Sequence, residues 1–266
     1  MHVLEIDQTL DRFFGKLGAS QTGALILDYD GTLAPFCVDR YAAFPYPGVS
    51  QALFRIMQDK RSRLVIVSGR PASELIPLLG IFPIPEIWGL HGLQRLLPDG
   101  DCRTHPLSNT DLNVLAEAGS WLEYQGLRQL AEFKNGSIAV HWRGLPLEET
   151  AFIAEKVGEG WSRLAAKSQM AVFDFDNGME IRPSLRTKAH AVRTVQAELE
   201  PGVPLAYLGD DRTDEDAFRA LRDSPQAITV LVRPEWRETE AEAWIKPPID
   251  LLDFFDRWLD CCGGAQ

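Results

Sequence analysis

Three short apolar runs, each ending in a polar group, constrain the fold of this 266-residue chain more than any other feature. The runs are ALIL before DYDGT, RLVIV before SGRP, and PLAYL before GDDRTDEDAF. Amphipathic stretches such as VSQALFRIMQDK and KAHAVRTVQAEL separate them. Apolar strands that alternate with helical periods predict a parallel sheet with helices on both faces. Ligands bind beyond the carboxyl ends of such strands, so the three polar groups are expected to form one composite site.

The middle of the chain has a different pattern. Residues 108–181 read as two helices and several short strands, and KNG and DNG are hairpin turn signals within this segment. We therefore predict an α/β fold with a Rossmann-like parallel core formed by residues 1–107 and 182–266. An α+β cap, residues 108–181, is expected to be inserted into that core.

Composition excludes several classes of function. The net charge of −11 argues against a nucleic-acid partner, because nucleic-acid surfaces carry basic patches, and it requires local cations for any anionic ligand. No apolar run has the length of a membrane span, and the first residues lack a secretory pattern. The four cysteines lack zinc spacing and are expected to be free thiols. We expect a cytoplasmic monomer that binds neither nucleic acid nor membrane.

Asp28 and Asp30 follow the first apolar run and precede Gly31 and Thr32. The simpler interpretation is a solvated Asp-Gly turn at a strand end. The functional interpretation makes Asp28 a carboxylate nucleophile and Asp30 a general acid and base for the leaving oxygen and water. Gly31 allows the tight turn that brings backbone N–H groups near a phosphate. The second D-x-D, at Asp174 and Asp176, precedes Asn-Gly and is predicted to be a hairpin turn.

Two further stretches supply candidate phosphate donors. In IVSGRP, Ser68 offers a hydroxyl and a backbone N–H, Gly69 adjoins it, and Arg70 offers a second side chain. The alternative is an ordinary strand–turn–helix with an exposed arginine. Lys188 stands near the start of a predicted helix, where a cation opposes the macrodipole, so a binding role becomes more plausible. Arg186 is the competing candidate nearby.

The acidic group GDDRTDEDAF suggests a metal site. A charged helix N-terminus explains its later acids, but adjacent carboxylates at a buried strand tip, Asp210 and Asp211, repel each other. A divalent cation removes that repulsion. Mg²⁺ prefers a few carboxylates together with water and substrate phosphate oxygens.

The ordered set D-x-D-G-T, Ser, Lys and G-D-D resembles the haloacid dehalogenase superfamily of phosphohydrolases. That resemblance implies that Asp28 is the nucleophile and that Asp30 is the general acid and base. It implies phosphate binding by Ser68 and Lys188. The implied Mg²⁺ ligands are Asp28, the backbone carbonyl of Asp30 and Asp210, with Asp211 and Asp214 in support.

Longer stretches, among them GLHG, FKNGSIAVHWR, MEIRP and GDDRTDEDAF, resemble the trehalose-6-phosphate phosphatase family. The resemblance implies candidates for binding sugar hydroxyls or phosphate: Lys134, His141, Arg143, Glu180, Arg182 and His91. Glu180 and Arg182 share one face of a strand, so a cross-strand charge pair is the alternative. A half-buried strand histidine is the alternative for His141, and a simple turn is the alternative for GLHG.

The activity implied by this resemblance is Mg²⁺-dependent hydrolysis of trehalose 6-phosphate, a small-molecule sugar phosphate, through an aspartyl-phosphate. One alternative is the same chemistry on sucrose phosphate or on a glucosyl- or mannosyl-glycerate phosphate. A non-catalytic sugar-phosphate-binding protein is a more distant alternative. A glycosyltransferase that uses D-x-D for a metal would leave the matching Ser, Lys and G-D-D groups unexplained.

Overall fold

The computed structural model describes residues 2–37 and 39–262, with the side chains of residues 2–7 excepted. The chain forms two compact units. The first contains the residues up to Thr104, then Lys188–Asp210, and the residues from Asp214 onward; the second contains His105–Thr187 with Asp211–Thr213. The cap predicted at 108–181 lies inside the second unit, which is longer at both ends. Arg186 Nη2 lies 3.1 Å from His105 Nδ1, so the two ends of this longer segment lie side by side.

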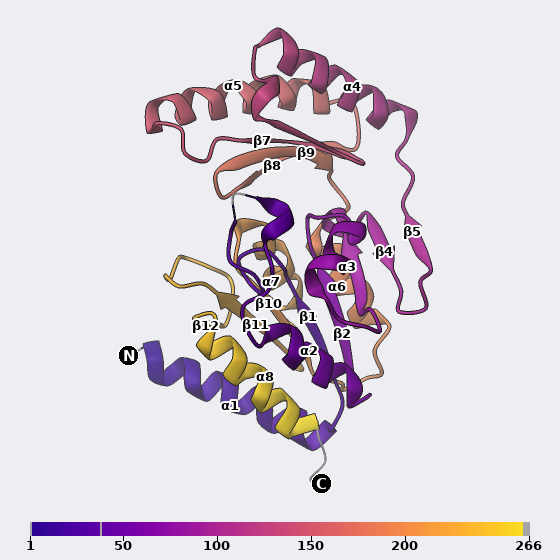
Figure 1. Ribbon diagram of the computed structural model, residues 1–266, viewed down its shortest axis with the longest axis vertical. Helices are drawn as coiled ribbons and strands as arrows, with labels where there is room; N and C mark the ends of the chain where they lie inside the picture. Colours follow the sequence, from indigo (N-terminus) through magenta and orange to yellow (C-terminus); the bar gives the residue numbers. More distant parts are fainter. Residues whose placement is uncertain (1, 38, 263–266) are drawn as a thin grey trace. The chain divides into compact units, whose positions relative to one another are not determined.

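The first unit is built on an eight-stranded sheet with the order β12-β11-β10-β1-β2-β3-β4-β5 (Figure 1). The first six of these strands pair in parallel, and only the β3–β4 and β4–β5 pairs are antiparallel. The strands are β1 (Gly23–Leu27), β2 (Ser62–Val67), β3 (Glu86–Gly89), β4 (Gln94–Leu96), β5 (Cys102–Thr104), β10 (Leu205–Gly209), β11 (Ala227–Val232) and β12 (Ala243–Ile245).

Helices cover both faces of this sheet, as the alternation of apolar runs and amphipathic stretches predicts. Leu25 and Leu27 of β1 pack into one core with α1, α2, α3 and α8, whereas Ala24 and Ile26 pack into the other with α6 and α7. Side chains of a strand alternate between faces, so one short run supplies both cores. The helices are α1 (His2–Ser20), α2 (Val49–Gln58), α3 (Ala72–Leu79), α6 (Lys188–Ala197), α7 (Glu215–Leu221) and α8 (Ile249–Cys262).

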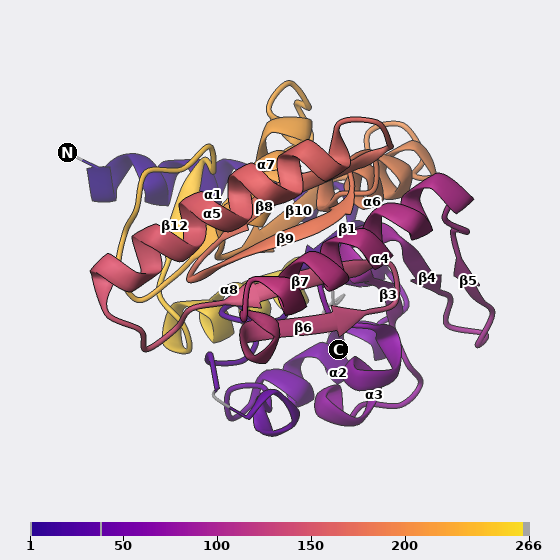
Figure 2. The same ribbon diagram turned by 90° about the horizontal axis from the view of Figure 1, so that it is seen from above.

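The second unit is an antiparallel sheet with the order β6-β7-β9-β8, covered on one face by two helices (Figure 2). Its helices lie side by side, and Val157 and Trp161 anchor the apolar core beneath them. Both predicted hairpins are present, with turns at Asn135-Gly136 and Asp176-Asn177. The elements are α4 (Asn109–Tyr124), β6 (Ala131–Lys134), β7 (Ser137–His141), α5 (Leu147–Ala165), β8 (Met170–Phe175) and β9 (Gly178–Pro183).

Across residues 2–37 and 39–262, none of the helices combines the length and the apolar character needed to span a bilayer.

Candidate active site

The polar groups that follow three neighbouring strands of the first unit meet at one edge of the sheet. Asp28 follows β1, Ser68 follows β2, and Asp210 follows β10. Leu27 is in register with Leu208 of β10 and with Ile66 of β2, so the carboxyl ends of the three strands are level. The parallel pairing therefore brings together residues that are up to 182 positions apart in the sequence.

Lys188, the first residue of α6, joins two buried carboxylates. Its Nζ donates to Asp28 Oδ1 at 2.7 Å and to Asp214 Oδ1 at 2.8 Å. Asp28 and Lys188 are each 3% exposed, and Asp214 is fully buried. The first turn of a helix does not favour a cation, so these two ion pairs stabilise the ammonium there.

Burial raises the pKa of Asp28 to about 7; Lys188 lowers the pKa and the charge of Asp214 raises it further. Burial also tends to lower the pKa of Lys188, but the carboxylates of Asp214 and Asp28 outweigh it and raise that pKa above its usual range. Lys188 therefore stays an ammonium while the Asp28 carboxylate remains accessible to protonation near neutral pH.

Asp28, Asp210 and Asp214 each place one carboxylate oxygen within 4.8 Å of the others. Three carboxylates thus gather in one buried site, where the ammonium of Lys188 pairs with those of Asp28 and Asp214. Oxygen donors are what Mg²⁺ and Ca²⁺ prefer, so the donor set fits the predicted cation. Asp214, predicted only in support, lies within this trio. Asp211 lies outside it, and its Oδ1 accepts the backbone N–H of Arg212.

Gly31 allows the chain to turn directly beside this cluster. Its φ is +82°, and its N–H donates to Ala34 O at 2.8 Å. A Cβ at this position would lie 2.0 Å from Asp210 Oδ2 and 2.8 Å from the ring of Phe36. Both the left-handed backbone and the close approach of Asp210 therefore require glycine.

Arg70 holds Asp30 instead of offering a free phosphate donor. Its Nε and Nη2 donate to the two carboxylate oxygens of Asp30, each at 2.7 Å, and its Nη1 donates to Arg40 O at 2.6 Å. A bidentate contact of this kind fixes the plane of the carboxylate. From SGRP alone, Arg70 was predicted to donate to the phosphate. The spacing of residues in the sequence does not show that its long side chain reaches the carboxylate of Asp30.

Ser68 is buried, and its two donors differ in role. Its backbone N–H bonds to Trp88 O at 2.9 Å within the β2–β3 ladder, so the predicted use of that group on phosphate is wrong. Its Oγ accepts the backbone N–H of Arg70 at 3.1 Å, which leaves the hydroxyl proton for another acceptor. A Cβ at Gly69 would lie 2.6 Å from His91 Nε2, so the GLHG turn packs His91 against the SGRP turn.

The second unit contains its own buried polar cluster around Glu180, which is 2% exposed. Lys134 Nζ and Ser137 Oγ donate to Glu180 Oε1 at 3.0 and 2.7 Å, and Arg182 Nε lies 3.5 Å from Glu180 Oε2. A pocket of about 310 Å³ in this unit is lined in part by Lys134 and Ser137. Lys134 and Ser137 thus link the β6–β7 hairpin to β9 through Glu180 and also line the pocket.

The other two candidates of the second unit lie nearer the solvent. The side chain of His141 is 45% exposed and its Nε2 lies 3.1 Å from Glu132 Oε2, so it pairs across β6 and β7. Arg143 is exposed in the segment after β7.

Sequence reasoning missed Tyr207, whose hydroxyl bonds to Asp214 Oδ1. The only signal was a tyrosine inside the otherwise apolar run PLAYL. A tyrosine is common in buried strands, and its partner is seven residues away, beyond the strand.

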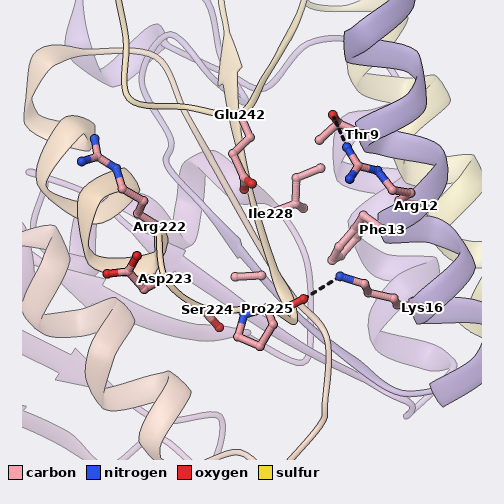
Figure 3. Close-up of a pocket in the computed structure, with 11 residues that line it drawn as sticks. Thr9, Arg12, Phe13, Lys16, Arg222, Asp223, Ser224, Pro225, Ile228 and Glu242 are labelled. Carbon is pink, nitrogen blue, oxygen red and sulfur yellow. Dashed lines mark hydrogen bonds between the residues drawn. The ribbon is translucent and has the colours of Figure 1, made fainter.

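A second hollow in the first unit has a different character (Figure 3). It measures about 330 Å³ and lies between α1 and the segment 222–228. Lys16 Nζ donates to Pro225 O at 2.6 Å, and Arg12 Nη2 donates to Thr9 Oγ1 at 3.2 Å. Its lining residues share no member with the acidic trio, so we assign the candidate active site to the strand ends.

The parallel sheet, the aspartates at its strand ends and the inserted α+β unit define a haloacid dehalogenase-like fold. A haloacid dehalogenase-like hydrolase from B. subtilis superposes with a TM-score of 0.60 at 14% identity, covering 85% of this chain and 95% of its own. Residues 26–243 match the sequence model of the trehalose-phosphatase family. The chain belongs to this family, which confirms the predicted fold class and resemblance.

Individual relatives agree with this assignment. The chain is 29% identical over 261 residues to a trehalose-phosphate phosphatase of Mycobacterium avium, covering 91% of this chain and 63% of that protein. It is 30% identical over 250 residues to one of Mycobacterium tuberculosis, covering 88% and 60%. The chain thus spans about three-fifths of the length of these curated relatives.

Two solved structures have a similar fold. Trehalose-6-phosphate phosphatase of Aspergillus fumigatus has a TM-score of 0.67 at 26% identity, covering 93% of this chain and 97% of that one. The C-terminal domain of the Candida albicans enzyme has a TM-score of 0.79 at 20% identity, covering 96% and 97%. At the lower identity, the likeness concerns the fold alone.

Proposed function

We propose that this protein is a Mg²⁺-dependent phosphatase that hydrolyses trehalose 6-phosphate to trehalose and phosphate. The observation that carries the proposal is the buried ion-pair chain from Asp28 through Lys188 to Asp214, beside Asp210, at the ends of parallel strands. Membership of the trehalose-phosphatase family and the names of the curated relatives support this choice of substrate.

The first chemical step transfers the phosphoryl group to Asp28. A carboxylate oxygen of Asp28 forms a bond to phosphorus while the bond from phosphorus to the sugar oxygen breaks. Asp30 in its acid form gives its proton to the departing sugar oxygen, which releases the free sugar and leaves an aspartyl-phosphate. The Lys188 ammonium, 2.7 Å from Asp28, offsets the negative charge that gathers around the phosphoryl group.

The second step hydrolyses the aspartyl-phosphate. The Asp30 carboxylate takes a proton from water as the water oxygen bonds to phosphorus, and the bond from phosphorus to the Asp28 oxygen breaks. Asp28 is restored as a carboxylate, phosphate leaves, and Asp30 carries the proton needed for the next cycle. The two-point contact with Arg70 fixes the orientation of the Asp30 carboxylate, the form of Asp30 that takes the proton from water.

Asp28, Asp210 and the backbone carbonyl of Asp30 are the groups we assign to Mg²⁺. When bound, Mg²⁺ supplies positive charge that screens the phosphate oxygens from the carboxylates. The net charge of the protein and the buried acids would otherwise repel a phosphate ester.

We further infer that the second unit contributes to substrate selection. Glu180 is paired with Lys134 through a hydrogen bond and with Arg182 through an ion pair in a largely buried cluster. A buried polar group that is built to bond a sugar hydroxyl is left unpaired by a ligand that lacks the hydroxyl, so such a ligand is strongly rejected. His91, His141 and Arg143 are further candidates for contacts with the sugar. Substitution of Lys134 by Ala should raise KM for the preferred sugar phosphate more than it lowers kcat.

The proposal is tested by phosphate release from a panel of trehalose 6-phosphate, sucrose 6-phosphate, glucosylglycerate phosphate and glucose 6-phosphate, with Mg²⁺ or with EDTA. We expect the highest kcat/KM for trehalose 6-phosphate and no turnover in EDTA. Preference for glucose 6-phosphate would overturn the disaccharide assignment. Activity in EDTA would overturn the metal assignment.

The nucleophile is tested by Asp28→Asn, which keeps the shape of the side chain but removes the attacking carboxylate. We expect turnover to fall to background while the circular dichroism spectrum stays unchanged. Asp174→Asn is the matched control, because the same substitution is made in the second D-x-D, at an exposed residue before a hairpin turn. Substantial activity in Asp28→Asn, or equal losses in both variants, would contradict the assignment.

A further inference from the structure

Tyr207 is a fully buried residue in the middle of β10, beneath the candidate active site. Its ring packs edge-on against Phe218 of α7, with centroids 5.7 Å apart. The hydroxyl is the only polar atom of the side chain, and it bonds to Asp214 Oδ1. The ring fills the core, and the hydroxyl reaches the acidic trio.

Both carboxylate oxygens of Asp214 accept hydrogen bonds from other residues of the protein. Oδ1 accepts from Tyr207 and, at 2.8 Å, from Lys188 Nζ. Oδ2 accepts the backbone N–H of Asp210 at 3.1 Å. A carboxylate held by three donors has little capacity left for a cation.

The same carboxylate is nevertheless close enough to serve as a metal ligand. One of its oxygens lies within 4.8 Å of the ligand oxygens of Asp28 and Asp210. The number of carboxylates that coordinate the cation, two or three, therefore depends on the hydrogen bonds that fix the position of Asp214. Burial, with the charge of Asp214, raises the pKa of Tyr207 well above its ordinary value, so the hydroxyl keeps its proton and acts as a donor.

We propose that Tyr207 is a positioning residue that holds Asp214 out of the coordination sphere of the cation, and that it thereby makes the site select Mg²⁺ over Ca²⁺. Mg²⁺ takes few carboxylates and keeps several waters, whereas Ca²⁺ takes six to eight oxygens and gains from an additional carboxylate. Withholding Asp214 therefore costs Ca²⁺ more than Mg²⁺. This inference rests on the metal site of the proposed function.

Two substitutions separate the hydroxyl from the ring. Tyr207→Phe removes only the donor to Asp214 and keeps the aromatic contact with Phe218. Phe218→Leu is the matched control, because it disturbs the same edge-on packing and leaves the hydroxyl in place. A merely structural role of Tyr207 would make the two variants behave alike.

The first measurement is isothermal titration of Mg²⁺ and of Ca²⁺ into the full chain without substrate. In Tyr207→Phe, we expect the affinity for Ca²⁺ relative to Mg²⁺ to rise about tenfold, the scale of one hydrogen bond to a charged group. In Phe218→Leu, the ratio should stay within about twofold of the wild-type ratio, since no ligand has been released. An unchanged ratio in Tyr207→Phe, or an equal rise in Phe218→Leu, would overturn the proposal.

A second comparison does not depend on the folding of Tyr207→Phe. Asp210→Asn removes an assigned ligand, whereas Asp214→Asn changes a carboxylate that the proposal places outside the coordination sphere. We expect Asp210→Asn to lose at least about tenfold more Mg²⁺ affinity than Asp214→Asn. Equal losses would show that Asp214 coordinates the cation and would refute the role of Tyr207.

These titrations contain no sugar phosphate, so they remain informative whether or not the wild-type protein releases phosphate from trehalose 6-phosphate. If it does, Ca²⁺ should inhibit Tyr207→Phe at roughly tenfold lower concentration than it inhibits wild type, by the same shift in selectivity. Equal sensitivity of the two proteins would count against the proposal without affecting the proposed phosphatase activity.

Discussion

Gly31→Ala tests whether the turn after β1 and the acidic trio are as tightly coupled as the structure shows. The added Cβ would stand 2.0 Å from Asp210 Oδ2, whereas ordinary contacts of a Cβ begin at 3.4 Å. The carboxylate or the turn must therefore move by the difference, roughly 1.4 Å. Phe36 limits movement of the turn on the other side, because its ring would lie 2.8 Å from the same Cβ.

Two costs add at this position. Forcing a side chain into the left-handed region costs about 1–2 kcal/mol, and overpacking a tight site costs about 1–3 kcal/mol more. We therefore expect Gly31→Ala to lower the free energy of unfolding by about 2–5 kcal/mol. A displacement of about 1 Å at a reacting centre costs on the order of 100-fold in rate, so kcat/KM should fall by at least that factor.

Gly100→Ala is the matched control. Gly100 has φ +90°, close to the +82° of Gly31, but among the described residues no atom lies within 4 Å of its added Cβ. Gly100→Ala should therefore lower the free energy of unfolding only by the cost of the left-handed backbone, about 1–2 kcal/mol, and should keep full activity. Urea unfolding and phosphate release at saturating Mg²⁺ measure the two quantities. Equal stabilities of the variants, or activity of Gly31→Ala within threefold of wild type, would refute the reasoning.

Two further predictions concern ion pairs of the first unit. Arg70→Lys replaces a two-point grip on Asp30 with a single ammonium, so kcat should fall about tenfold or more with little change in KM; a fall in KM alone would contradict the positioning role. Hydrogen bonds from Arg95, the larger effect, and from Arg63 lower the pKa of Glu198 from 4.5 to about 2. Because the folded-state pKa is depressed, the stabilisation is complete above pH 4.5 and is lost as the pH falls toward 2. The side chain is 39% exposed, so Glu198→Gln should cost only about 0.5–1 kcal/mol at pH 7. In urea unfolding, that difference should shrink between pH 4.5 and 3, and a constant difference would contradict the linkage.

The sequence was sufficient to predict the sheet and the place of its polar groups. ALIL and PLAYL are too short and too continuously apolar for anything but buried strands, and parallel pairing puts Asp28 and Asp210 at one edge. A binding role for Lys188 was predicted from its unfavourable position at the start of a helix. Its two ion pairs, with Asp28 and Asp214, account for that position. These inferences depend on local pattern and on one rule of sheet topology.

The remaining details depend on contacts that local pattern does not encode. Nothing in SGRP shows that Arg70 reaches back 40 residues to Asp30, or that the N–H of Ser68 belongs to a sheet ladder. The contact of Tyr207 with Asp214 likewise depends on how the strand ends beside a 3-10 turn. Long, flexible or buried polar side chains choose partners in three dimensions, and single-sequence spacing leaves those choices open.

The contact between Arg186 and His105 has a consequence for how the chain is assembled. A segment of more than 80 residues leaves the first unit and returns to it with its two ends side by side. Loop-closure entropy grows only with the logarithm of length, and here the second unit closes the gap by its own folding. For the first unit, the long inserted segment is therefore equivalent to a short loop. The strands and helices on either side of it can pack together whatever the length of the segment between these two ends. We therefore expect that modules of other sizes can be inserted between the same two ends without a change in the parallel sheet.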